Sequence, residues 1–335
     1  MKSFLFKLFI VSFSLFFLLL NGCKQEEKAN VEIKYLDPAE AAESAKQIRK
    51  DVTVTVGDGL ELTLWATDSL APDPVALDVD DQGRVYLTRT NRQKHSEFDI
   101  RGHVDWMTAS ISLKTVEDRR AFLKKTFAPE NSAQNEWLDD LNGDGSHDWR
   151  DLAVEQEEIF RLEDQSGDGV ADMAQLYLRD FNTEITDVAG ALMAYKDNVF
   201  VGLGPDMWRT WDDNGDGQAD RKESISHGYN VHIGFGGHGM SGLRVGPDGR
   251  IYWGIGDIGS YIVDKTGKVW DNANQGAIFR SNPDGTDFEV FARGLRNTHE
   301  FVFDEYGNLM SVDNDGDHPG ESERMVYIVY GSDTG

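Results

Sequence analysis

The stretch LRVGPDGRIYWGIGD, residues 243–257, decides the fold. Apolar residues alternate with polar or small ones on both sides of a Pro-Asp-Gly turn, which is the pattern of a β-hairpin. Related stretches recur at ALDVDDQGRVYLT (76–88), ALMAYKDNVFVGLG (191–204) and FVFDEYGNLMSVDND (301–315). This recurrence indicates one structural unit used several times along the chain.

A second kind of hairpin alternates with the first. It occurs at residues 159–178, 207–225 and 277–295, where two apolar runs flank a turn rich in Asp, Asn and Gly. Two hairpins make a four-stranded blade, so the chain predicts an all-β fold of the β-propeller type. We count four to five blades, and the final MVYIVYGSDTG (325–335) falls within an outer hairpin, so we expect the propeller to be incomplete, with C-terminal blades missing.

One segment interrupts the repeat, at about residues 90–158. TVEDRRAFLKKTFAP (115–129) has apolar residues at helical spacing after a Thr cap and an early Glu, which predicts a helix. We therefore expect a helical insertion that leaves one blade and covers a face of the propeller domain, residues 51–335. Long insertions of this kind often build a ligand site or its lid.

Charge limits the classes of partner. The 335 residues include 33 Lys and Arg against 59 Asp and Glu, a formal net charge of −26. Nucleic acid is excluded as a partner, because a polyanion requires a basic surface. The acidic balance is compatible with a secreted protein that binds divalent cations.

The N-terminus predicts export. Basic residues and the short apolar run that ends near residue 20 are typical of a signal peptide, residues 1–22. LNGC (20–23) resembles a bacterial lipobox, so we expect Cys23 to carry lipid, residues 23–50 to form a tether, and the protein to be anchored in the cell envelope, at the outer membrane and facing the periplasm or the surface. The alternative is a secreted protein with a leftover cysteine. Cys23 is the only cysteine, which excludes an internal disulfide and a CxxCH haem site.

Aspartate-rich loops suggest calcium, because alternate carboxylates on a loop that bends at Gly can converge on one hard cation. Hairpin turns also favour Asp, Asn and Gly, so structural turns remain the alternative, above all for the second and third loops. The candidate ligands are, in the first loop, Asp140, Asn142, Asp144, Asp148 and Asp151; in the second, Asp212, Asn214, Asp216, Asp220 and Glu223; and in a third loop without a carboxylate at position 12, Asp164, Ser166, Asp168 and Asp172.

Two histidines lie in the glycine-rich HIGFGGHGMSG (232–242), just before the hairpin quoted first. Glycine lets a backbone approach a flat ligand closely. A histidine presented there can act as a general base, because its ordinary pKa lies near neutral pH. The alternative for His238 is a histidine satisfied within a turn.

GHGMSGLRVGPDGRIYWGIGD (237–257) and ARGLRNTHEFVFDEYGNLMSVDNDGDHPGESE (292–323) resemble the soluble sugar dehydrogenases that use pyrroloquinoline quinone (PQQ), also described as glucose/sorbosone dehydrogenase-like. From residue 60 onward the chain is more similar to large membrane-bound dehydrogenase and haem-binding-domain lipoproteins of planctomycetes and Bacteroidota. The resemblance implies a six-bladed, TolB/NHL-like β-propeller.

The resemblance also implies roles for residues of this chain. It makes His238 the base that takes the proton of the substrate hydroxyl, with His232 as the second choice. Arg296 and Asn297 match the residues that hold the quinone and its developing negative charge, a task suited to a fixed guanidinium. A calcium ion on the quinone would be held by carboxylates of DNDGDHPGESE, namely Asp313, Asp315, Asp317, Glu321 and Glu323.

Two functions follow as hypotheses. The first is a PQQ-dependent oxidoreductase that oxidises a sugar or a related alcohol outside the cytoplasm and passes electrons to an acceptor such as a cytochrome c. The second is a non-catalytic propeller, stabilised by calcium, that binds carbohydrate or protein. A propeller lyase or hydrolase is disfavoured, because no pair of carboxylates stands out in the sequence.

Overall fold

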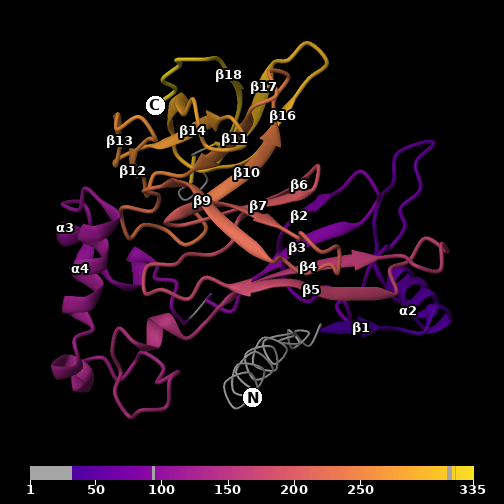
Figure 1. Ribbon diagram of the computed structural model, residues 1–335, viewed down its shortest axis with the longest axis horizontal. Helices are drawn as coiled ribbons and strands as arrows, with labels where there is room; N and C mark the ends of the chain where they lie inside the picture. Colours follow the sequence, from indigo (N-terminus) through magenta and orange to yellow (C-terminus); the bar gives the residue numbers. More distant parts are fainter. Residues whose placement is uncertain (1–31, 93–94, 315–318, 321) are drawn as a thin grey trace, which may run out of the picture. The chain divides into compact units, whose positions relative to one another are not determined.

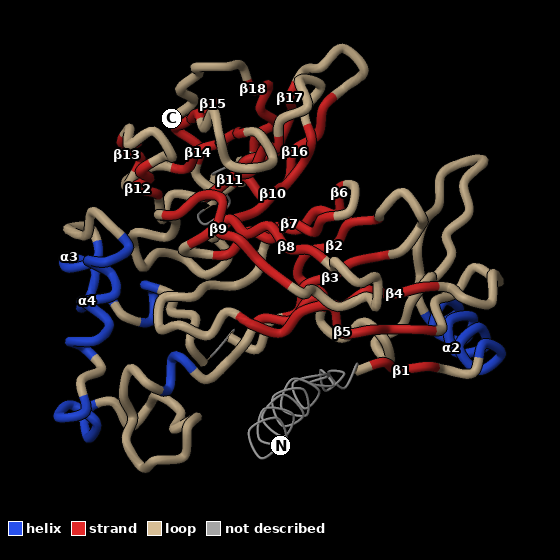
Figure 2. The backbone as a smooth tube through the Cα atoms, viewed as in Figure 1, coloured by secondary structure: helices blue, strands red, loops and turns tan. Residues whose placement is uncertain are grey.

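The computed structural model describes residues 32–335 except 93–94, 315–318 and 321 (Figure 1). Residues 33–335 form one compact unit. Cys23, Asp315, Asp317 and Glu321 lie outside the described residues. Strands dominate this unit and helices are few, as the tube in Figure 2 shows.

Four antiparallel sheets have the arrangement of propeller blades, and a short ribbon extends from the third. Their strand orders are β1-β5-β4-β3-β2, β6-β7-β8-β9, β10-β11-β14-β15 and β16-β17-β18, with β12-β13 as the ribbon. The bounds are β1 Ile33–Tyr35, β2 Pro74–Val79, β3 Val85–Arg89, β4 Glu157–Glu163, β5 Met173–Asp180, β6 Ala191–Tyr195, β7 Asn198–Leu203, β8 Asp206–Trp211, β9 Arg221–His227, β10 Met240–Val245, β11 Ile251–Ile255, β12 Ser260–Val263, β13 Val269–Asn272, β14 Gly276–Ser281, β15 Glu289–Leu295, β16 Thr298–Phe303, β17 Leu309–Asp313 and β18 Arg324–Ile328.

The four sheets meet along one edge strand each, namely β2, β6, β10 and β16. β2 contacts β6, β6 contacts β10, and β10 contacts β16. This is the arrangement of inner strands around a propeller axis. The prediction of an all-β, propeller-like fold is confirmed, but the prediction of six blades is wrong for the described residues, which form four. The count of four to five blades from the hairpin repeats agrees with these four, whereas the number six was implied by the resemblance alone.

The hairpin that decides the fold forms in the predicted register. Val245 pairs with Ile251 and Leu243 with Trp253, on either side of the Pro-Asp-Gly turn. Gly249 adopts a φ of +76°, which favours glycine. The backbone N–H of Gly246 donates to the carbonyl of Arg250 at 2.8 Å and closes the turn. Each of the other predicted hairpins also pairs its two strands.

Apolar side chains fill the space between neighbouring sheets. Phe200 of the second sheet and Trp253 and Phe279 of the third are fully buried in one cluster. Edge-to-face and tilted aromatic contacts link this cluster, including Trp253 with Phe279 at 6.0 Å between ring centroids. The packing fixes the ends of the inner strands, and these ends carry the site described below.

The helices lie outside the sheets (Figure 2). α2 (Pro38–Asp51) lies between β1 and β2, and the others lie between β3 and β4: η1 Ile100–Gly102, η2 Val104–Trp106, α3 Met107–Ser110, α4 Val116–Thr126, η3 Pro129–Gln134 and η4 Asp151–Ala153. The predicted helix is α4. Thr115 caps it and forms a capping box with Asp118, which satisfies N–H groups at its first turn. Within the described residues, no helix has the length and apolar character needed to cross a membrane.

Two sheets have an apolar face that the described residues leave uncovered. On the first sheet, Val75, Leu77 and Val79 of β2 are exposed. On the fourth, Val302, Val312 and Met325 are exposed, each on a different strand.

Candidate active site

A cavity of about 580 Å³ opens where the inner strands begin. Its walls come from the end of β3, the segment that follows β3, the loop before β6, the start of β10 and β16. The polar side chains that line it are Thr90, Glu97, Asp99, Arg101, Asp187, Ser241 and His299. A cavity of this size with several converging polar groups is the default candidate for a ligand site. We call it the axial pocket.

The glycine-rich run before β10 forms one wall of the axial pocket, and carboxylates hold it in place. The N–H of Gly236 donates to Asp99 at 3.0 Å, and the N–H of Gly237 donates to Glu97 at 3.2 Å. A side chain on Gly239 would begin 2.7 Å from Oδ2 of Asp187. The glycines therefore allow the backbone to approach carboxylates of the protein itself closely.

These carboxylates differ in how their charge is balanced. Arg101 binds Asp99 through two nitrogens, at 2.9 and 2.6 Å, and lowers the pKa of Asp99 well below its usual range. Burial and the neighbouring Asp187 raise the pKa of Glu97 to about 7. Burial likewise raises the pKa of Asp187, and the guanidinium of Arg119 opposes that rise. Glu97 and Asp187 are thus a pair of carboxyls, far apart in the sequence, that meet at one pocket.

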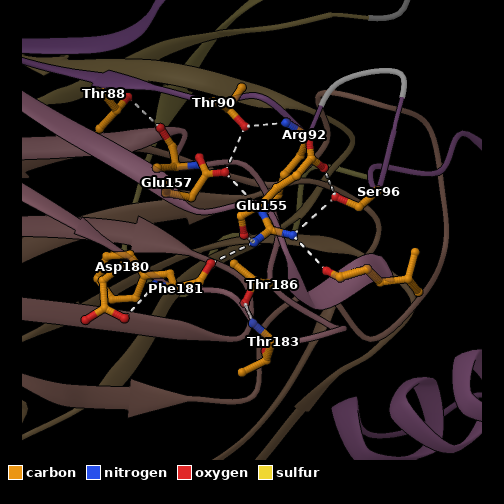
Figure 3. A network of polar contacts seen from close by, with 12 residues as sticks. Thr88, Thr90, Arg92, Ser96, Glu155, Glu157, Asp180, Phe181, Thr183 and Thr186 are labelled. Carbon is orange, nitrogen blue, oxygen red and sulfur yellow. Dashed lines mark hydrogen bonds and ion pairs between the residues drawn. The ribbon is translucent and has the colours of Figure 1, made fainter. Parts of the chain in front are cut away.

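Behind this wall, Arg92 is the centre of a buried network (Figure 3). It is 1% exposed, and its Nε lies 3.1 Å from Oε1 of Glu157. Its other nitrogens donate to the hydroxyl of Ser96 and to the carbonyls of Leu152, Glu155 and Phe181. Arg92 therefore ties the first sheet to both ends of the helical segment.

Among the described residues, Glu157 is the only carboxylate that forms an ion pair with Arg92. Thr90 donates its hydroxyl to Oε1 at 2.8 Å, and the N–H of Ala189 donates to Oε2 at 2.9 Å. Burial nevertheless raises the pKa of Glu157 to about 7. Because Thr90 and the loop around residue 189 also border the axial pocket, this network sets the shape of the pocket.

His238 forms a dyad with Asp257. Its Nδ1 lies 2.7 Å from Oδ1 of Asp257, and its ring is buried. The carboxylate accepts only, so Nδ1 carries the proton and Nε2 is left able to accept one. His238 lies just behind the pocket wall, because Gly237 and Gly239 on either side of it line the cavity. The sequence analysis did not assign a role to Asp257.

Gly256 brings His238 and Arg296 together. A Cβ on Gly256 would lie 2.7 Å from the carbonyl oxygen of His238 and 3.0 Å from that of Arg296. The N–H of Asp257 donates to the carbonyl of Arg296 at 2.7 Å. Phe235 contacts both side chains, with its ring centroid 5.3 Å from that of His238 and 5.6 Å from the guanidinium of Arg296. Two residues of the predicted site, His238 and Arg296, therefore flank one aromatic ring.

Asp313 holds the turn that carries Arg296 and Asn297. It is buried and accepts from the N–H of Arg296 at 3.1 Å, from that of Asn297 at 2.8 Å, and from Arg324 at 2.8 Å. These contacts employ the carboxylate as a backbone clamp. The side chain of Arg296 also donates to Oδ1 of Asn314 at 2.7 Å.

The amide of Asn297 faces His299. Its Nδ2 lies 3.0 Å from Nε2 of His299, whose pKa is lowered by burial and by the nearby His238. The neutral His299 therefore accepts, and Oδ1 of Asn297 is buried with no hydrogen-bond partner among the described residues. His299 lines the axial pocket, so Asn297 and His238 both lie within one side chain of the cavity.

His232 occupies a different place. Its Nδ1 lies 2.6 Å from the carbonyl of Ser110 and its Nε2 lies 3.0 Å from Oδ1 of Asn274. With both ring nitrogens hydrogen-bonded, His232 connects α3 to the loop after β13. It does not line the axial pocket.

The three aspartate loops share one hydrogen-bond pattern. Each first aspartate accepts backbone N–H groups three to five residues later: Asp140 from residues 144 and 145, Asp164 from 167 to 169, and Asp212 from 215 and 217. Each closing aspartate, Asp151, Asp172 and Asp220, accepts N–H groups near the start of its loop.

The remaining candidate ligands of these loops also have protein partners. Asp148 and Asp144 pair with Arg150, at 2.6 and 3.2 Å, and Glu223 lies 3.6 Å from Lys265. Asn142, Asn214 and Asp216 accept backbone N–H groups. In the part of the chain that the structure describes, no three His, Cys, Asp or Glu side chains are grouped so that they could hold a metal ion.

A family model matches residues 44–328, and its description reads "Domain of unknown function (DUF7133)". No curated protein matches the chain in sequence. Solved structures match with partial coverage. The PQQ-bound aldose sugar dehydrogenase of Streptomyces coelicolor is 18% identical, with 54% of this chain and 55% of that chain covered and a TM-score of 0.37.

Two further structures match in the same way. A glucose dehydrogenase is 11% identical, with 52% of this chain and 57% of that chain covered and a TM-score of 0.38. The holo PQQ domain of pyranose dehydrogenase from Coprinopsis cinerea is 13% identical, with 51% and 45% covered and a TM-score of 0.33. The chain thus matches less than two thirds of the length of each of these structures.

Proposed function

We propose that the chain, which belongs to the DUF7133 family, is an oxidoreductase. It oxidises a sugar or a related alcohol outside the cytoplasm, with PQQ as cofactor. The observation that carries the proposal is the His238–Asp257 dyad, 2.7 Å between Nδ1 and Oδ1, beside Arg296 and next to the axial pocket.

The residues present fit a flat quinone. Arg296 provides a fixed positive charge against the ring of Phe235, and the buried Oδ1 of Asn297 is an acceptor that lacks a partner among the described residues. We propose that Arg296 and Asn297 hold the quinone. When bound, that cofactor would accept two electrons from the substrate as a hydride.

The protein's own part in the reaction is proton transfer. Asp257 keeps the Nδ1 proton of His238 in place, so Nε2 can accept the proton of the substrate hydroxyl as the C–H bond is broken. The guanidinium of Arg296 stabilises negative charge without needing to be protonated first. Electrons would then leave to an external acceptor such as a cytochrome c.

Quinone titration of the purified chain tests the proposal directly. We expect saturable quenching of tryptophan fluorescence by PQQ and reduction of an electron-accepting dye on addition of an aldose. Arg296→Ala should weaken quinone binding, and Arg221→Ala on the exposed end of β9 is the matched control. Absence of quinone binding by the wild-type chain would contradict the proposal.

The second candidate function is a non-catalytic propeller, stabilised by calcium, that binds carbohydrate or protein. The spacing of oxygen-bearing side chains in the three aspartate loops supports it, because alternate oxygen ligands on a loop that bends at Gly can converge on a calcium ion. A chain that binds calcium and sugar but no quinone would support this second function.

Attachment to the cell envelope belongs to the same proposal. Cys23 lies outside the described residues, and the lipobox-like LNGC is its support. We propose a lipid-anchored protein at the outer membrane, facing the periplasm or the surface.

A further inference from the structure

Charge does not balance at the axial pocket. The ionisable groups that line it are Glu97, Asp99, Arg101, Asp187 and His299, and Arg92, Arg119 and Glu157 are buried behind its wall. Arg92 pairs with Glu157, and Arg101 pairs with Asp99. Arg119 is the cation that acts on Asp187, and His299 is held neutral. Glu97 lines the cavity and forms no direct ion pair with a described cation, although the charge of the buried Arg119 also acts on it.

A buried amide adds an acceptor beside Glu97. Asn230 is 1% exposed, and its Nδ2 donates to Oδ2 of Asp187. Because the carboxylate accepts, this contact fixes the orientation of the amide, and Oδ1 is left with no partner among the described residues. Asn230 lines a small cavity of about 20 Å³, which Glu97 and Asp187 also line. Glu97 and Asp187 line both cavities, so the axial pocket has carboxyl groups on this side and the amide of Asn230 lies behind them.

A neutral hydroxyl can donate to such a wall, but it cannot balance the charge of a half-buried carboxylate. A protonated amine does both, since it carries three donors and one positive charge. A substrate that placed a carboxylate against Glu97 would be repelled, because like charges at short range in a partly buried site cost free energy.

We propose that Glu97 is the subsite for a protonated amine, and that the axial pocket takes an amino sugar or amino alcohol in preference to neutral or acidic sugars. This inference rests on the proposed function, because it names the substrate class of that site. Asp187 and Asn230 position the subsite from behind, and Asp99 with Arg101 closes it on the solvent side.

Proton release is a consequence that can be measured. At pH 6 the free protein holds a proton on Glu97, because the pKa of that carboxyl is about 7. An ammonium group placed beside it favours the ionised form, so binding must release the proton. Affinity for the amine should therefore rise with pH up to about 7 and fall again at the pH where the free amine itself loses its proton.

Calorimetric binding of glucosamine, glucose and gluconate to the full chain tests the proposal without requiring turnover. We expect glucosamine to bind at least tenfold more tightly than glucose, gluconate to bind more weakly than glucose, and the heat at pH 6 to vary with the ionisation enthalpy of the buffer. Glu97→Gln should abolish the preference for glucosamine, and Glu97→Asp should keep part of it. Glu130→Gln, on the exposed η3, should leave the preference unchanged.

Each alternative outcome has a definite meaning. Equal affinity for glucosamine and glucose, or an undiminished preference in a folded Glu97→Gln variant, would overturn the amine subsite. Thermal melts of each variant separate loss of the subsite from loss of the fold. A quinone titration that succeeds while the amine preference fails would refute this inference alone. An amine preference without quinone binding would instead refute the proposed oxidation.

Discussion

Oδ1 of Asp257 lies 2.7 Å from Nδ1 of His238, and the N–H of the same Asp257 donates to the carbonyl of Arg296. One aspartate, two residues after the end of β11, thus connects the candidate base to the candidate quinone-binding arginine. Its effect on His238 is to fix which nitrogen carries the proton. Asp257 is a positioning residue, since it acts through His238.

Asp257→Asn should lower kcat for sugar oxidation by ~10²–10⁴-fold, the usual contribution of a correctly poised general base. An asparagine can donate to Nδ1 and so favour the wrong tautomer. We expect quinone affinity to change little and the fall in rate with decreasing pH to be altered, which steady-state kinetics between pH 5 and 9 would measure. A rate loss with an unchanged pH profile would indicate a merely structural role for Asp257.

Arg92→Met should destabilise the fold by about 3–5 kcal/mol, because it leaves the charge of Glu157 buried without its partner. The double variant Arg92→Met/Glu157→Gln should recover part of that loss. Urea denaturation of the two single variants and the double variant measures the coupling. Arg221→Met provides the comparison: Arg221 pairs with Asp213 at the surface, where water and salt screen the ion pair, so its loss should be much smaller. Similar losses for Arg92→Met and Arg221→Met would contradict the buried network.

Stability should fall between about pH 4.5 and pH 7 through Glu97 and Glu157. Each has a folded-state pKa raised to about 7 from the ordinary 4.5. The stabilising contribution of such a group is fully present below its unfolded pKa and is lost as the pH rises through its folded pKa.

Glu97→Gln should therefore be more stable than the wild type at pH 8 and should depend less on pH across this window. Urea midpoints at half-unit intervals from pH 4.5 to 8 are the measurement. A wild-type curve that rises steadily over this range, with no difference in Glu97→Gln, would show that these carboxyls ionise normally in the folded protein.

Calcium should raise the melting temperature if the aspartate loops bind it, since a ligand of the native state stabilises by mass action, by about 2.7 kcal/mol at 100 times Kd. Asp140→Asn and Asp212→Asn should each reduce the response. Asp264→Asn, in a turn without the loop motif, should leave the response intact. Identical melts in chelator and in millimolar calcium would mean that the loops are ordinary turns.

Cys23→Ser should release the protein from the membrane fraction. The LNGC sequence predicts a lipid on this residue, and a single lipid-bearing cysteine is the anchor that the sequence offers. Labelled fatty acid incorporated by the wild type and absent from the variant is the measurement. A variant that still fractionates with membranes would remove the basis for the anchor.

Local patterns of the sequence were enough to predict the hairpins and α4. In residues 243–257 the alternation and the turn involve neighbours in the chain, and Gly249 takes its left-handed conformation whatever lies beyond the hairpin. The capping box of α4 is likewise contained in four consecutive residues. For the same reason His238, Arg296 and Asn297 could be named in advance, because their short motifs carry the resemblance. Their roles stay a prediction.

The tertiary structure alone decided the axial pocket. Glu97 comes from the segment after β3, Asp187 from the loop before β6 and Asn230 from the loop after β9, and no short-range pattern connects them. No pattern in the sequence indicates a carboxyl pair, and the fold brings Glu97 and Asp187 together. Whether a carboxyl is a surface charge or a proton-binding group depends on its burial and on which cations reach it. Those are properties of the packed sheets, and they arise only when the four inner strands meet.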